Sequence, residues 1–188
     1  MAASACDPRA LILAVAEGNQ AAFAELYTHL QAAMLRYATG LLAGDRDAAA
    51  DAVDEAFFDI WRHAARFADE GSAEGWVRRI VRNKTVDLNR RNRERLAASE
   101  DEAAAFEALP DDTQTPAEQA ETISTSDELR RQMQRLSLEH REVVWLCYFE
   151  EKPLAEIAAI MDCPENTVKT RLFHARKQLR ALLREQAP

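Results

Sequence analysis

Two clusters of basic side chains are the residues of this sequence best suited to chemistry with a partner. Residues 74–95 carry eight basic residues against three acidic ones: Arg78, Arg79, Arg82, Lys84, Arg90, Arg91, Arg93 and Arg95. Residues 166–184 carry six more and no acidic residue: Lys169, Arg171, Arg176, Lys177, Arg180 and Arg184. Guanidinium and ammonium groups bind phosphates, and arginine and asparagine also donate to base edges. Both clusters therefore predict contacts with nucleic acid.

The overall charge of the chain argues against nucleic-acid binding, but the distribution of that charge does not. The chain of 188 residues has a net charge of −8. Non-specific affinity for DNA comes mainly from neutralised phosphates, so an acidic chain would be a poor binder. However, residues 96–129 hold ten acidic residues and no basic one: Glu100, Asp101, Glu102, Glu107, Asp111, Asp112, Glu118, Glu121, Asp127 and Glu128. Charge sorted into blocks indicates partners of opposite charge.

No pattern for covalent or metal chemistry accompanies the basic clusters. The sequence has no paired carboxylates, Ser/His/Asp set, phosphate-binding glycine loop or ligand cluster, so we expect no enzyme activity, cofactor, metal or small-molecule substrate. Cys6, Cys147 and Cys163 lack CxxC spacing, which predicts partly buried, reduced thiols and a cytoplasmic location. The apolar run at residues 11–16 is too short to insert into a membrane.

The elements that position these clusters are predicted to be helices. Only five glycines and six prolines occur, and alanine, leucine, glutamate and arginine dominate, which favours an all-α fold. Residues 8–95 and 127–184 predict two helical domains. Residues 96–126 are acidic, alanine-rich and almost free of large apolar side chains, so they predict a flexible linker.

The second domain has the pattern of a helix-turn-helix. Apolar spacing predicts a helix over residues 154–161, the Asp162-Cys163-Pro164 sequence interrupts it, and a new helix begins there. One sector of the new helix is apolar: Val168, Leu172, Ala175, Leu179, Leu182 and Leu183. Its opposite side carries Phe173 among cations. Such a ring could contact a thymine methyl in the major groove, or pack on the neighbouring domain or a partner protein.

Two helices of the first domain also have distinctive outer faces. Over residues 47–65, Phe58 lies among acidic residues, which suits either a solvated face or an anchor for a basic partner. Over residues 74–91, Trp76, Val77, Ile80, Val81 and Leu88 are predicted to face inward. Arginines and asparagines are predicted to cover the outer side. Because acidic residues that would relieve the repulsion are few, a nucleic-acid contact is favoured over a solvated surface there.

In their order along the chain, these motifs resemble the extracytoplasmic-function (ECF) sigma factors of the sigma-70 family. DAAADAVDEAFFDIW at residues 47–61 and WVRRIVRNKTVDLNRR at residues 76–91 are similar to region 2 of that family. LSLEHREVV at residues 136–144, EIA at residues 156–158 and NTVKTRLFHARKQL at residues 166–179 are similar to region 4. One helix-turn-helix alone would be weak evidence, whereas both regions in order across a linker are specific.

The resemblance implies a transcription initiation factor that binds core RNA polymerase and promoter DNA, serves a stress response, and is regulated by an anti-sigma factor. The implied polymerase-binding residues are Asp51, Asp54, Glu55, Phe58 and Trp61, although Trp61 faces inward and could act mainly as core. The implied minus-10 residues, beside the loop at residues 69–75, are Arg78, Arg79, Arg82, Asn83, Asn89, Arg90 and Arg91. The implied minus-35 residues are Asn166, Thr167, Lys169, Thr170, Arg171, Phe173, His174, Arg176 and Lys177.

Two positions depart from the family, and two other functions remain open. Asn166 stands where the family usually has glycine, and Ser137 stands where it usually has proline, so Asn166 is either a DNA contact or simply tolerated. A conventional regulator would bind a palindromic operator without polymerase, but leaves the acidic face around Phe58 unexplained. A sigma-like decoy would be expected to carry a receiver domain, for which 188 residues leave no room.

Overall fold

The structure is helical throughout the residues that it describes, which confirms the predicted all-α class. The computed structural model describes residues 7–67, 72–100, 129 and 131–184. Cys6, residues 69–71 of the predicted minus-10 loop and residues 101–126 of the predicted linker lie outside them. None of the described helices is long and apolar enough to cross a membrane.

The first domain is a bundle of α1 (Pro8–Ala16), α2 (Gln20–Leu41), α3 (Arg46–His63), a 3-10 turn η1 (Ala64–Arg66) and α4 (Ala73–Glu100). Short polar side chains cap the helix starts, because the first amides of a helix lack partners within it. The side chains of Asp7, Asn19 and Asp45 accept hydrogen bonds from backbone amides of the first turns of α1, α2 and α3. Aspartate and asparagine are among the residues most often found at such N-cap positions.

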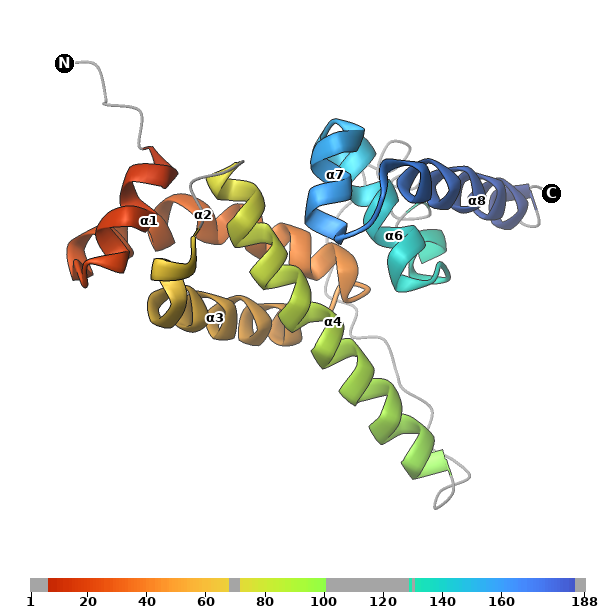
Figure 1. Ribbon diagram of the computed structural model, residues 1–188. Helices are drawn as coiled ribbons and strands as arrows, with labels where there is room; N and C mark the ends of the chain where they lie inside the picture. Colours follow the sequence, from red (N-terminus) through yellow and green to blue (C-terminus); the bar gives the residue numbers. More distant parts are fainter. Residues whose placement is uncertain (1–6, 68–71, 101–128, 130, 185–188) are drawn as a thin grey trace, which may run out of the picture.

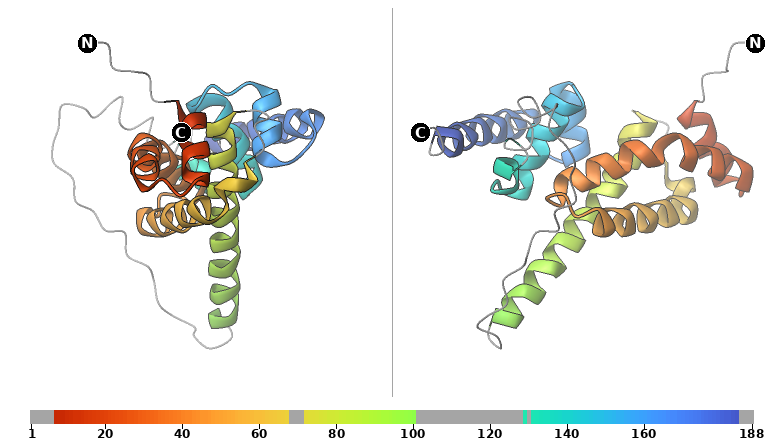
Figure 2. Two further views of the ribbon diagram at one scale, coloured as in Figure 1. Left: turned by 60° about the vertical axis from the view of Figure 1, so that its left-hand side comes forward. Right: turned by 180° about the vertical axis from the view of Figure 1, so that it is seen from behind.

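Helix α4 is longer than the sequence predicted. Its first half packs on α2 and α3, and its second half projects away from the bundle (Figures 1 and 2). The helix continues to Glu100, past residue 91, where the predicted helix ended, and so includes residues 96–100, which the sequence assigned to the linker. Leucine, alanine and glutamate are strong helix formers and extend α4 there.

The second domain contains the predicted helix-turn-helix. After a helical turn at residues 131–134 come α6 (Leu138–Val144), a π-helix η2 (Trp145–Phe149), α7 (Leu154–Met161) and α8 (Glu165–Arg184). Ser137, the departure from the family's proline, caps α6 by accepting a hydrogen bond from the His140 amide at 3.3 Å. Asp162 ends α7 in the left-handed conformation, with φ of 52°, a position that short polar residues tolerate. The π-helix was not predicted.

The two domains pack directly on each other. Helix α7 lies against α4, and α6 lies against the end of α2 (Figure 1). Buried apolar residues of both domains form one continuous cluster, from Ile12 of α1 to Ala175 of α8. The sequence predicted two domains and did not predict that their cores would join.

Candidate nucleic-acid and polymerase interfaces

The acidic face of α3 has the exposure that the sequence predicted. The Phe58 side chain is 54% exposed, and Asp51, Asp54 and Glu55 are exposed around it. The Arg62 guanidinium lies 4.2 Å from the centroid of the Phe58 ring, a cation–π contact at the solvent boundary. A large apolar ring left in solvent among carboxylates suits contact with a basic partner.

Other side chains partly hold this acidic face in place. Trp61 is half-buried with its ring centroid 5.3 Å from that of Phe23, so it serves at least partly as core. The Tyr27 hydroxyl donates to Asp54 at 3.0 Å. On the α4 side, the Lys84 ammonium lies 2.7 Å from Asp59 and 3.7 Å from Glu55. The hydrogen bond to Asp59 raises the pKa of Lys84 and keeps the ammonium charged.

The later turns of α4 present their polar residues to solvent. Asn83, Arg90 and Arg91 are exposed, and Asn89 is half-buried. Arg90 pairs with Asp87 at 3.1 Å, a surface contact that contributes little to stability. Trp76 is half-buried against Phe67, with ring centroids 5.3 Å apart, which agrees with the inward orientation predicted for it. These outer residues are free to meet a partner.

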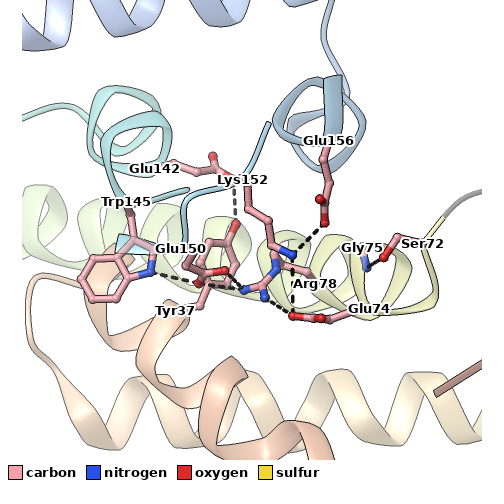
Figure 3. Close-up of polar contacts among 10 residues, drawn as sticks. All are labelled: Tyr37, Ser72, Glu74, Gly75, Arg78, Glu142, Trp145, Glu150, Lys152 and Glu156. Carbon is pink, nitrogen blue, oxygen red and sulfur yellow. Dashed lines mark hydrogen bonds and ion pairs between the residues drawn. The ribbon is translucent and has the colours of Figure 1, made fainter. Parts of the chain in front are cut away.

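The first turns of α4 correct the predicted outer face. Arg78 was expected in solvent, yet it is only 2% exposed. Its guanidinium lies 2.6 Å from Glu74 on the same helix and 2.6 Å from Glu150 of the second domain (Figure 3). Arg82 pairs with Glu142 at 2.7 Å, and Arg79 with Asp162 at 2.6 Å. The second domain covers Arg78 and much of Arg82, whereas the Arg79 side chain stays 46% exposed, as predicted.

Glu142 is the most buried carboxylate of this interface. It is fully buried and accepts hydrogen bonds from the Tyr37 hydroxyl at 2.8 Å and from Arg82 Nε at 2.7 Å. Burial raises the pKa of the Glu142 carboxyl, although Arg82 opposes the shift. Burial, with the Glu142 carboxylate, also raises the pKa of Tyr37 well above its ordinary value. Glu142 Oε2 and Arg78 Nε have no hydrogen-bond partner among the described residues.

The outer face of α8 is open to solvent along its length. The exposed side chains are those of Asn166, Lys169, Thr170, Phe173, His174, Arg176 and Lys177. Phe173 is 64% exposed, and its ring makes a T-shaped contact with that of His174 on the same helix, with centroids 5.4 Å apart. It therefore does not pack on the first domain, which removes that alternative. Thr167 and Arg171 are half-buried, and Arg171 Nη1 lies 3.9 Å from the Cys163 sulfur.

The apolar sector of α8 is mostly buried, with one exception. Val168, Leu172, Ala175 and Leu182 are buried and Leu179 is half-buried, as predicted. Leu183 is 40% exposed, whereas Leu182 beside it in the last turn is only 8% exposed. Cys147 and Cys163 are half-buried and not disulfide-bonded, which agrees with the partial burial predicted for them. Among the described residues, no group of histidine, cysteine and acidic side chains could hold a metal ion.

Sequence reasoning missed the residues that join the domains. Glu150 and Glu142 accept hydrogen bonds from Arg78 and Arg82 of α4. The Tyr37 hydroxyl donates to Glu142, and Trp145 Nε1 donates to Glu150 at 3.1 Å (Figure 3). A signal was present: Arg141 and Glu142 interrupt the apolar side of α6, directly before Val143 and Val144. Charged residues at core positions usually have buried partners.

Comparisons with known proteins place both domains in one family. The model of sigma-70 region 2 matches residues 26–95, and that of sigma-70 region 4 matches residues 126–179. The ECF RNA polymerase sigma factor SigL of Mycobacterium tuberculosis is 31% identical over 179 residues, covering 94% of this chain and 97% of SigL. RfaY of Xanthomonas campestris, described as a probable RNA polymerase sigma factor, is 30% identical over 167 residues, which span 88% of this chain and 41% of RfaY.

A solved structure shares the arrangement of helices. The sigma factor RpoE, crystallised with the anti-sigma factor NepR from Bartonella quintana, superposes with a TM-score of 0.64. The match covers 88% of this chain and 98% of that one, at 22% sequence identity. At 22% identity, this similarity shows that the two proteins share a fold.

Proposed function

This chain belongs to the ECF sigma factors of the sigma-70 family, and from that premise we propose that it binds core RNA polymerase and directs initiation at a small set of stress-response promoters. Its proposed place of action is the cytoplasm, where polymerase and promoters meet. It is a non-enzymatic initiation factor, which recognises promoter DNA and holds the melted strand.

One observation carries the proposal: the exposed Phe58 face of α3 occurs in the same chain as two cationic helices, α4 and α8. The acidic α3 face suits a basic surface of the polymerase. The polar and cationic residues of α8 suit a major groove, with Phe173 against a thymine methyl. Those of α4 suit the backbone and unstacked bases of a melted strand. An operator-binding regulator would need no surface like that around Phe58.

Complex formation tests the proposal. The purified protein is mixed with core polymerase, separated by gel filtration, and each fraction is assayed for retention of promoter-length DNA from a random pool. We expect a complex with core that retains a selected sequence class. Selective retention of palindromic DNA by the free protein would favour a conventional regulator instead.

Promoter selectivity should depend on Phe173. Replacing it with alanine removes an exposed ring that contacts little of its own domain, so the fold should be unchanged. We expect a loss of about 1–3 kcal/mol in discrimination at one base position of the minus-35 element, the usual worth of a specific contact. Selection on a promoter library measures this, and Leu183→Ala, also an exposed apolar truncation on α8, is the control. Equal selectivity of both variants and wild type would remove Phe173 from base recognition.

We further propose that an anti-sigma protein regulates this chain. The support is family membership and a shared fold with RpoE, which was solved bound to NepR. Such a partner would need to engage both domains to keep α4 and α8 from DNA. Co-purification from the native host, followed by inhibition of initiation by the recovered protein, tests this.

A further inference from the structure

The Asp54 carboxylate of α3 is held by a chain of two hydrogen bonds that begins on the neighbouring helix α2. Gln31 Nε2 donates to the Tyr27 hydroxyl oxygen at 2.8 Å, and that hydroxyl donates to Asp54 Oδ1 at 3.0 Å. Tyr27 and Gln31 are four residues apart on α2, so they lie on the same side of that helix. Two helices together therefore set the position of one exposed acidic side chain.

The direction of this hydrogen-bond chain follows from the donors it contains. A tyrosine hydroxyl has a single proton, and an amide nitrogen can only donate. Because Gln31 Nε2 occupies a lone pair of the Tyr27 oxygen, the hydroxyl proton is left for Asp54. Burial and the hydrogen bond to Asp54 raise the pKa of Tyr27, so the hydroxyl keeps the proton that it donates.

The Tyr27 ring is anchored on the core of the first domain, which makes its hydroxyl a fixed point. The ring centroid lies 4.8 Å from that of Phe57 in an edge-to-face contact, and Phe57 is buried. Tyr27 itself is half-buried, whereas Asp54 is exposed. A ring with an apolar body and a polar tip thus connects the rigid core to a carboxylate in water.

Asp54 is held without losing its negative charge, unlike its neighbour Glu55. The Lys84 ammonium lies 3.7 Å from Glu55 and 2.7 Å from Asp59, so it offsets part of their charge. The donor to Asp54 is a neutral hydroxyl, which orients the carboxylate and leaves its full charge for a partner. Asp54 and Phe58 are four residues apart on α3, so the oriented carboxylate lies beside the exposed ring.

We propose that Tyr27 is a positioning residue for core-polymerase binding: it holds Asp54 ready to pair with a basic side chain of the polymerase, next to the surface that takes the Phe58 ring. The inference rests on the proposed polymerase-binding role of the α3 face. Ordering an exposed side chain on binding costs conformational entropy, and a carboxylate that is already held in place avoids that cost. Tyr27 exerts this effect through Asp54 and needs no contact of its own with polymerase.

Tyr27→Phe is the sharpest test, because it removes only the hydroxyl and keeps the ring against Phe57. Rates of association with and dissociation from immobilised core polymerase are measured at several salt concentrations. We expect the affinity to fall about fivefold, the usual worth of one hydrogen bond, through faster dissociation. The association rate and its salt dependence should match those of wild type, since the net charge is unchanged.

Tyr148→Phe is the matched control for loss of a hydroxyl. Tyr148 is 51% exposed and belongs to the second domain, and its ring contact with Arg176, at 5.3 Å, does not involve the hydroxyl. This variant should bind core polymerase as tightly as wild type.

A double-mutant cycle separates positioning from a general structural effect. If Tyr27 acts through Asp54, Tyr27→Phe should cause no further loss of affinity in an Asp54→Ala background. It should keep its fivefold effect in an Asp51→Ala background, because Asp51 lies on the same face of α3 but receives no hydrogen bond from Tyr27.

The proposal is overturned if Tyr27→Phe binds core polymerase as tightly as wild type, if Asp54→Ala does so, or if Tyr27→Phe weakens binding equally in all three backgrounds. Each of these outcomes leaves the effect of Phe58→Ala on core binding untouched, and that variant tests the α3 face itself. Failure of the positioning role is therefore distinguishable from failure of the proposed function.

Discussion

Replacing Phe58 with alanine should weaken binding of the protein to core RNA polymerase by about 30-fold or more, or about 2 kcal/mol, the scale of an aromatic hot spot. The ring is 54% exposed, and its described close contact is with Arg62 on the same helix. Its removal should therefore cost little folding stability. Without the ring, the interface with polymerase would bury less apolar area. Water would also reach the neighbouring carboxylates, which the ring would otherwise shield.

The affinity of the Phe58→Ala variant for core polymerase is measured by competition against the wild-type protein. Circular dichroism checks that the variant is folded. Leu13→Ala is the matched control, because Leu13 is also apolar and 45% exposed but lies on α1. A Phe58→Ala variant that competes as well as Leu13→Ala would show that the acidic face is merely solvated. The core-binding role of this face would then have to be abandoned.

Replacing Arg141 with methionine should lower the free energy of unfolding by about 3 kcal/mol or more, because several buried carbonyls would lose their donor. The Arg141 guanidinium donates to the carbonyl oxygens of Met133, Gln134 and Leu136, which fixes the chain entering α6. A fourth bond reaches the Leu41 carbonyl at the end of α2. Burial lowers the pKa of this guanidinium, a sign of how far it is removed from water.

Urea unfolding of the full chain measures this loss. Arg135→Met is the control, since Arg135 is an exposed arginine in the same segment. We expect the midpoint of the Arg135 variant to stay near that of wild type while the Arg141 variant unfolds at clearly lower urea. Similar midpoints for the two variants would contradict a structural role for the buried guanidinium.

Local signals in the sequence were sufficient for the helices and for the helix-turn-helix. Apolar spacing placed the sector of α8 correctly except for Leu183, which is 40% exposed. The exposure of Phe58 and Phe173 also followed from helical phase, since each ring is opposite a well-defined apolar side. These successes depend only on residues within about two turns of each other.

Contacts between distant segments were beyond the same reasoning. Helical phase predicted Arg78 on the outer side of α4, yet its guanidinium lies 5.2 Å from the centroid of the buried Tyr37 ring of α2. Whether water or another domain covers this arginine depends on Glu150, which lies 72 residues later in the sequence. The π-helix at Trp145–Phe149 likewise has no local signature that we used. The DNA and polymerase contacts of the individual side chains stay predictions.

Reconstituted transcription on a randomised promoter library tests the central claim most directly. With core RNA polymerase and this protein as the only initiation factor, we expect transcripts that begin at fixed distances from two enriched elements, one per cationic helix. Core alone should give no such enrichment. A complex that binds core yet yields no promoter-directed transcripts, or sequence selection that persists without core, would contradict a role in initiation.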